Sequence, residues 1–132
     1  MAINILLSED CSAVRHMISK TLEISDIPFN QIHEAKDGHE GLEILRNHRI
    51  DLILLDINMP EMDGAEMLNR VKADPDLCDI PTLVISAQSN TRRVDAFDHK
   101  NVQFLFKPFT PERLRQAVKN LLEIEDDQDK IS

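Results

Sequence analysis

Apolar residues along this chain gather in short runs that end at acidic or turn-forming residues. The clearest run is Leu52 to Leu55, which leads directly into Asp56 and then into the segment Ile57 to Gly64, which contains Pro60. An apolar run of roughly four to eight residues between turn signals is typical of a strand buried on both faces, although a buried helix segment shows the same pattern. The proline and glycine that follow favour a strand and then a loop. An ionised carboxylate is costly in apolar surroundings, so Asp56 must lie at a solvated strand end or beside a cation.

Segments of this kind alternate with segments of helical periodicity along most of the chain. The expected strands are Ile3–Ser8, Gln31–Ala35, Asp51–Asp56, Thr82–Ser86 and Val102–Phe106. Three helices are expected from apolar residues at helical spacing, each with its own buried positions. The first is capped by Ser12 and buries Val14, Met17, Ile18 and Leu22; the second follows Asp37-Gly38 and buries Leu42 and Leu45; the third follows Gly64 and buries Met67, Leu68 and Val71.

The last predicted helix has the clearest start. Thr110 is a suitable N-cap, and Pro111 suits the first helical position. Its apolar stripe is formed by Leu114, Ala117, Val118, Leu121 and Leu122. The segment Ser89–Lys100 is the weakest helix candidate, because it offers only Val94, Ala96 and Phe97 for burial.

Strands that alternate with helices through right-handed crossovers predict a doubly wound α/β fold, with a parallel sheet covered on both faces. In such sheets ligands bind at the carboxyl ends of the strands. The polar residues expected there are Glu9, Asp10, Asp56, Ser86 and Lys107. Carboxylates about 4 Å apart repel by roughly 4 kcal/mol per pair at intermediate dielectric, a cost that a divalent cation removes. Oxygen ligands with room for water and a phosphoryl oxygen suit Mg²⁺.

Composition narrows the classes of protein that remain. The chain has 132 residues, 42% of them hydrophobic, which predicts one domain with its own core. Its start has no secretory signal, and Cys11 and Cys78 have neither a disulfide pattern nor zinc-ligand spacing, so we expect a cytoplasmic protein. The net charge of -9 argues against direct binding to nucleic acid or to an anionic membrane. Residues 123–132 are acidic and predict a frayed tail or, alternatively, a linker to an output domain.

Four motifs carry a resemblance to a known family. They are Ile5-Leu6-Leu7-Ser8-Glu9-Asp10, Leu54-Leu55-Asp56-Ile57-Asn58-Met59-Pro60-Glu61-Met62-Asp63-Gly64, Ile85-Ser86-Ala87 and Phe106-Lys107-Pro108-Phe109. In this order and spacing the chain resembles the receiver domain of two-component response regulators, in particular the single-domain chemotaxis type. The resemblance spans Ile3 to Leu122, so we expect a receiver domain over residues 1–122 and the tail over 123–132. It implies a five-stranded (βα)5 flavodoxin-like sheet with strand order 2-1-3-4-5.

The resemblance also implies roles for the residues at the strand ends. Asp56 would accept a phosphoryl group from a sensor histidine kinase or a phosphotransfer protein, and the family acts as a switch that assists its own phosphorylation and dephosphorylation rather than as an enzyme. Mg²⁺ would be held by Glu9, Asp10, Asp56 and the main-chain carbonyl of Asn58. Lys107 would contact a phosphoryl oxygen, and the peptide bond after it is expected to be cis.

Further residues are implied to sense the phosphoryl group. Ser86 would bond a phosphoryl oxygen with the Ala87 amide nearby, while Asn58 and Gln88 would tune the lifetime of the phosphoryl group. Ser86 and Phe104 would then switch a protein-binding face that a downstream protein target reads. That face is formed by the three segments 89–100, 102–106 and 111–122. We expect a monomer or a weak dimer.

Two departures and several alternatives stay open at this point. Glu9 stands where the family most often has aspartate, and Asp98–Asn101 replaces the usual Gly-Ala pair. A flavin carrier would need a glycine-rich phosphate loop where Ser8–Cys11 stands, and a haloacid dehalogenase-like phosphatase would need a second aspartate at Asn58. A phosphorylation-independent adaptor, or a receiver fragment of a larger regulator, is the remaining alternative.

Overall fold

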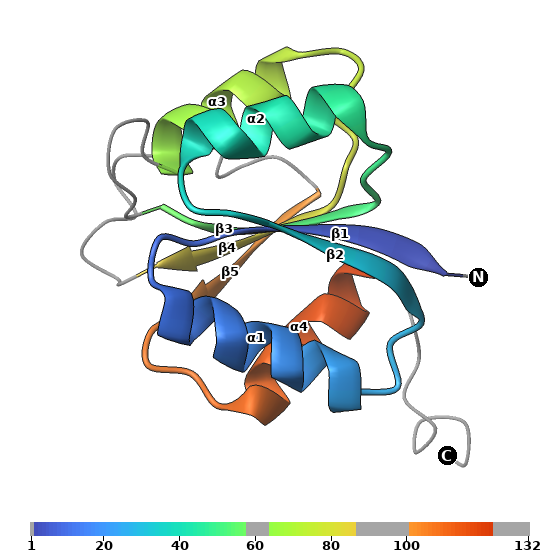
Figure 1. Ribbon diagram of the computed structural model, residues 1–132, viewed down its shortest axis with the longest axis vertical. Coiled ribbons are helices and arrows are strands. Elements are labelled where there is room, and N and C mark those ends of the chain that lie inside the picture. Colours follow the sequence, from blue (N-terminus) through green and yellow to red (C-terminus); the bar gives the residue numbers. More distant parts are fainter. Residues whose placement is uncertain (1, 58–63, 87–100, 123–132) are drawn as a thin grey trace.

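The computed structural model describes residues 2–57, 64–86 and 101–122. These residues form five strands and four helices (Figure 1). The strands are β1 (Ile3–Ser8), β2 (Phe29–Ala35), β3 (Leu52–Asp56), β4 (Thr82–Ser86) and β5 (Val102–Phe106). The helices are α1 (Ser12–Ile24), α2 (Gly38–Asn47), α3 (Gly64–Ala73) and α4 (Pro111–Leu122). The weak helix candidate 89–100 and the tail 123–132 lie outside the described residues.

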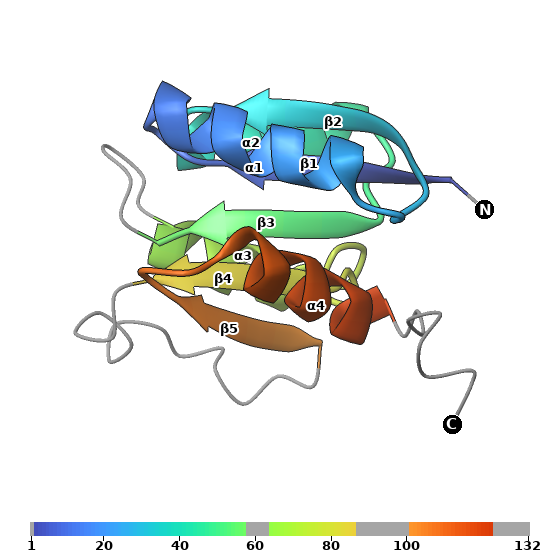
Figure 2. The ribbon, with the colours of Figure 1, turned by 90° about the horizontal axis from the view of Figure 1, so that it is seen from below.

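The five strands form one parallel sheet in the order β2-β1-β3-β4-β5. Figure 2 shows this order from one edge of the sheet to the other, with all strands running in the same direction. In Figure 1, α2 and α3 cover one face, while α1 and α4 cover the other. The predicted doubly wound α/β fold and its strand order are therefore confirmed, and the carboxyl ends of all five strands meet at a single edge.

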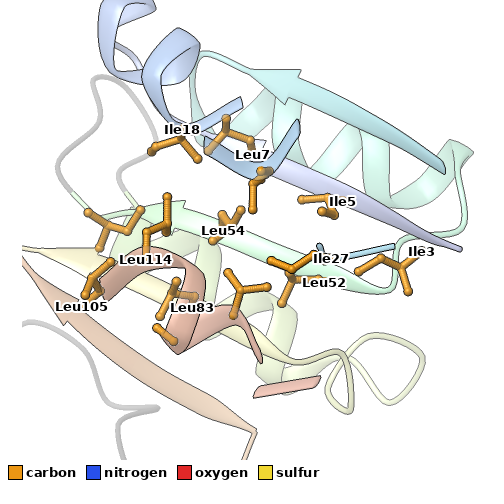
Figure 3. Close-up of a cluster of buried hydrophobic side chains, with 14 residues drawn as sticks. Ile3, Ile5, Leu7, Ile18, Ile27, Leu52, Leu54, Leu83, Leu105 and Leu114 are labelled. Atoms are coloured by element: carbon orange, nitrogen blue, oxygen red, sulfur yellow. The ribbon is translucent and has the colours of Figure 1, made fainter. Parts of the chain in front are cut away.

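The central strand β3 explains why its sequence is an unbroken apolar run. Ile53 and Leu55 pack in the core between the sheet and the α2–α3 layer, whereas Leu52 and Leu54 belong to the core on the α1–α4 side (Figure 3). All four side chains have no exposed surface. Because both faces of β3 are buried, the first polar side chain that the strand tolerates is Asp56, at its carboxyl end.

Helix starts agree with the predictions in two cases and differ in one. Thr110 accepts a hydrogen bond from the Arg113 amide at 3.1 Å, as expected of an N-cap. Asp37 likewise caps α2, accepting a hydrogen bond from the amide three residues later at 2.9 Å. The prediction that Ser12 caps α1 is wrong, since Cys11 holds the N-cap position and its side chain makes no capping hydrogen bond.

Three further details of the prediction need correction. Strand β2 begins at Phe29 rather than at Gln31, and β3 begins at Leu52 rather than at Asp51. Met17, predicted to be buried, is 37% exposed. It lies one residue before Ile18, about 100° around the helix, and Ile18 is the one of the two that is fully buried.

One buried charge was not predicted. Lys119 lies within the apolar stripe of α4 and has no exposed surface. Its Nζ donates to the Asp26 carboxylate at 2.7 Å, which ties α4 to the segment that follows α1. Among the described helices, none has both the length and the apolar character needed to cross a bilayer.

Candidate functional site

The polar residues predicted to share one edge of the sheet do meet there. Strands β1, β3 and β4 end at Ser8, Asp56 and Ser86, which places Glu9 and Asp10 directly after β1 and Lys107 directly after β5. A groove of about 720 Å³ lies instead at the amino ends of the strands, near residues 45–51 and 74–81. The acidic residues and Lys107 therefore gather at the carboxyl edge of the sheet and not in this groove.

An ion pair between neighbouring strand ends forms the centre of the site. The Lys107 Nζ lies 2.8 Å from the Asp56 Oδ2. Asp56 is 2% exposed, while the lysine side chain is 35% exposed, so the cation reaches the buried acid from the solvent side. Burial alone would lower the pKa of Lys107, but the hydrogen bond and charge of Asp56, together with the charges of Glu9 and Asp10, raise it. The lysine therefore stays charged beside the acid.

The position of Lys107 is set by the end of β5. Its amide donates to the Ser86 carbonyl at 2.9 Å, which continues the β4–β5 ladder by one residue. The Lys107–Pro108 peptide bond is cis, as the resemblance implied.

Glu9 is held in an unusual environment for a carboxylate. It is 2% exposed, and its Oε1 accepts a hydrogen bond from the Cys11 amide at 3.3 Å. Its Oε2 is buried and accepts no hydrogen bond from the described residues. Burial, and then the neighbouring Asp56 carboxylate, raise the pKa of Glu9 to about 9. One oxygen of this side chain is therefore fixed, while the other needs a proton or a cation.

These groups fit a hard divalent cation. Glu9, Asp10 and Asp56 each offer a carboxylate oxygen, and these oxygens all lie within 4.8 Å of one another. Asp10 is exposed, whereas the other two acids are buried, so water can reach one side of the cluster. All-oxygen ligands with open positions suit Mg²⁺ or Mn²⁺ better than softer metals. Such a cation would lower the pKa of Glu9 and would give its buried Oε2 a partner.

Ser86 and Phe104, the predicted switch residues, lie on the neighbouring strands β4 and β5. Ser86 is fully buried at the end of β4, opposite Phe106 in the parallel register. Phe104 is half-buried and packs against the core on the α2–α3 side. Its ring stacks on Phe106, with centroids 5.8 Å apart and planes inclined by 10°. The predicted residues Asn58, Ala87 and Gln88 lie outside the described residues.

Arg15 is a residue of the site that the sequence analysis missed. Its Nη1 donates to the main-chain carbonyls of Glu9 at 2.7 Å and of Asp10 at 3.2 Å. The available signal was an arginine in the first turn of a helix with no acidic residue in that turn, although helix starts favour negative charge. An arginine at such a position needs a partner outside the helix.

Comparison with known proteins decides which family has this arrangement. A family model described as the response regulator receiver domain matches residues 5–119, most of the chain. The chain belongs to the response regulator receiver domain family. Receiver domains take part in two-component signalling as phosphoacceptor switches rather than as conventional enzymes, and the family carries an acidic Mg²⁺ pocket. Histidine kinases and downstream targets are the partners of such domains.

Individual relatives agree with this assignment. The chain is 30% identical to chemotaxis protein CheY-3 of Vibrio cholerae over 122 residues, covering 92% of each chain. It is 32% identical to response regulator MprA of a Mycobacterium species, covering 92% of this chain but only 51% of that protein. Receiver domains thus match this chain both as nearly whole proteins and as parts of longer ones.

Solved structures show the same fold with closely similar geometry. The signal receiver domain of a histidine kinase from Syntrophus aciditrophicus superposes with a TM-score of 0.80 at 31% identity, covering 92% of this chain and 91% of that one. The Mn²⁺-bound form of response regulator Rcp1 superposes with a TM-score of 0.74 at 30% identity, covering 90% and 91%. The phosphorylated cyanobacterial phytochrome response regulator RcpA superposes with a TM-score of 0.74 at 32% identity, covering 93% of each chain.

Proposed function

We propose that this receiver domain is a Mg²⁺-dependent switch in which Asp56 accepts a phosphoryl group from a histidine kinase or a phosphotransfer protein. A carboxylate oxygen of Asp56 forms a bond to phosphorus, the bond between phosphorus and the donor histidine nitrogen breaks, and that nitrogen keeps the electron pair. The observation that carries this proposal is the buried Asp56 held 2.8 Å from Lys107 and beside a second buried acid. The named relatives, one of them a phosphorylated regulator, support it.

The chain's own residues would divide the work of transfer. Asp56 lies at the end of the rigid strand β3, so the acceptor is held in place for in-line attack. Lys107 would neutralise charge on one phosphoryl oxygen, and Ser86 would donate to another, contacts worth roughly 1.5–3 kcal/mol each when charge-assisted. Glu9 and Asp10 would hold Mg²⁺, which supplies charge neutralisation to the phosphoryl oxygens when bound.

The output of the switch would be a change in a protein-binding face. Ser86 and Phe104 lie on adjacent strands, and Phe104 packs against the core, so a shift of the serine can be passed to packing at β5. We assign the readout to the face around β5 and α4. The domain would extend over residues 1–122 and work in the cytoplasm, passing the signal to a protein target, with the lifetime of the phosphoryl group tuned by the residues 58 and 88.

Intact-mass measurement tests the acceptor directly. The protein is incubated with Mg²⁺ and acetyl phosphate, beside an EDTA control and the variant Asp56→Asn. We expect one labile phosphoryl adduct on the wild type and none in either control. The matched variant Asp76→Asn, which alters an exposed loop acid far from the site, should be labelled like the wild type. Labelling of Asp56→Asn would contradict the assignment of the acceptor.

Some receiver domains do not react with small phosphodonors, so the same samples are also tested with beryllofluoride, which forms a stable mimic of the aspartyl phosphate. We expect binding to the wild type in the presence of Mg²⁺, with loss of binding in Asp56→Asn. If neither the adduct nor beryllofluoride binding is found, the protein is a phosphorylation-independent adaptor.

A further inference from the structure

We propose that Arg15 is a positioning residue that sets the cation-binding geometry of Glu9 and Asp10. The inference rests on the proposed Mg²⁺ site and concerns how that site is built. The Arg15 Nη1 donates to two consecutive main-chain carbonyls, those of Glu9 at 2.7 Å and Asp10 at 3.2 Å. Both carbonyls belong to residues whose side chains form the acidic cluster. One guanidinium therefore fixes the peptide groups that carry two of the three acids.

The arginine is itself anchored from the neighbouring strand. Its Nε donates to the Glu34 Oε1 on β2 at 3.2 Å, and its side chain is only 20% exposed. The next residue of β2, Ala35, accepts a hydrogen bond from the Glu9 amide at 2.9 Å. The loop after β1 is thus tied to the end of β2 twice, directly through its main chain and indirectly through Arg15. A planar guanidinium suits this task, because its donors point in fixed directions.

Helix preferences do not account for the position of Arg15. Its amide donates to the Cys11 carbonyl, so it lies in the first turn of α1, where the helix dipole disfavours a cation. The first turn contains no acidic residue that would pair with it. The side chain instead folds back toward the carbonyl groups that precede the helix. A cation at this position destabilises the start of α1. We infer that the contacts of Arg15 with the loop after β1 outweigh this loss of helix stability.

Position and charge predict opposite effects when Arg15 is removed. A guanidinium near the acidic cluster repels a divalent cation, so if only its charge mattered, removing it would strengthen cation binding. If it orients the ligands, removing it weakens cation binding, because the carboxylates lose their fixed separation. Residues that orient metal ligands typically contribute about 10- to 100-fold in affinity. The sign of the change therefore separates the two roles.

The experiment measures Mn²⁺ binding to the full chain by the electron paramagnetic resonance signal of free Mn²⁺. Arg15→Gln is expected to weaken binding about 10-fold, and Arg15→Lys to restore part of it, since lysine keeps the charge but lacks the fork of donors. Glu34→Gln, which removes only the exposed anchor, is expected to weaken binding about 2- to 3-fold. The matched control is Lys20→Gln, which removes an exposed cation from the same helix, and it should bind like the wild type.

The outcomes separate this inference from the function on which it rests. Binding is measured at a temperature at which circular dichroism shows every tested variant to be folded. A loss of binding then cannot be due to unfolding. If the wild type binds no Mn²⁺, the proposed cation site is wrong. If the wild type binds while Arg15→Gln binds equally well or more tightly, the positioning role is overturned. Should Arg15→Gln not fold, Arg15→Lys and Glu34→Gln decide the question, and wild-type affinity in both overturns the inference.

Discussion

Replacing Glu9 with glutamine should stabilise the cation-free protein at neutral pH while weakening cation binding. Glu9 is buried beside Asp56, and its pKa is raised from 4.5 to about 9 by burial and by that neighbour. At pH 7 the folded protein therefore keeps a proton on Glu9 that the unfolded chain releases. Glutamine has nearly the same shape and has no proton to release, so Glu9→Gln removes this cost of folding.

The size of the effect follows from the same pKa values. A raised carboxyl pKa means that stability is greatest below pH 4.5 and is lost as the pH rises toward 9. Within this window the free energy of unfolding falls by about 1.4 kcal/mol for each pH unit. Between pH 4.5 and pH 7 the total loss is therefore about 3 kcal/mol. Coulomb repulsion between two ionised carboxylates is of the same order, since oxygens no more than 4.8 Å apart repel by at least about 3 kcal/mol at an effective dielectric constant of about 20.

Urea unfolding in EDTA at pH 5, 6, 7 and 8 measures this difference. The stability of Glu9→Gln minus that of the wild type should be small at pH 5 and grow with pH to about 3 kcal/mol at pH 7. Glu43→Gln, at an exposed position of α2, should stay within about 0.5 kcal/mol of the wild type at every pH. Saturating Mg²⁺ should favour the wild type instead, because the proposed site binds the cation more tightly with glutamate than with glutamine at position 9. A difference in EDTA that does not change with pH would refute the reasoning.

Three other predictions concern packing, a buried charge and a helix cap. Gly64→Ala should unfold at clearly lower urea concentrations and lose phosphoryl acceptance, because an added Cβ would lie 2.2 Å from the main-chain oxygen of Asp56 and backbone has to move. Asp26→Asn should destabilise the protein more than Lys119→Met in thermal unfolding, since the first removes a negative charge 2.7 Å from a fully buried ammonium, whereas the second leaves a half-exposed carboxylate beside Arg115. Lys119 lowers the pKa of Asp26, so the contribution of this pair should be present above pH 3.8 and disappear as the pH falls further. Thr110→Ala should cost about 1 kcal/mol in urea unfolding through loss of the cap, and an unchanged midpoint would contradict that role.

The fold was predictable because its strongest signals are local. The apolar run of β3 ends at Asp56 because both faces of that strand are buried, and this alone places an acid at the carboxyl edge of the sheet. The order of the strands came from the resemblance and not from periodicity. Boundaries were less certain where burial is weak, as in β2, most of whose side chains are half-buried or exposed, so that its start at Phe29 left little apolar pattern.

The residues that were missed have partners that no local sequence pattern indicates. Lys119 reads as an ordinary polar position on α4, and only its packing against Asp26, 93 residues away, shows why a cation is tolerated in the core. Arg15 reads as a surface residue of a helix, because its partners are main-chain carbonyls that no sequence pattern records. Asp56 and Lys107 could be proposed from the sequence because a charged residue directly after a predicted strand is enough to mark a candidate. No knowledge of their contacts was needed.

The hydrogen bond of the Glu9 amide offers a way to measure cation binding at this site in solution. Its hydrogen bond to the Ala35 carbonyl adds one residue to the ladder between β1 and β2, beyond the last pair of the two strands. Glu9, a proposed cation ligand, is therefore also hydrogen-bonded to the edge strand β2, and exchange of its amide hydrogen requires the loop after β1 to separate from that strand. A cation that binds only the closed loop slows this exchange by the factor 1 + [L]/Kd. Exchange at one backbone position thus measures cation occupancy of an unlabelled protein, without a phosphodonor.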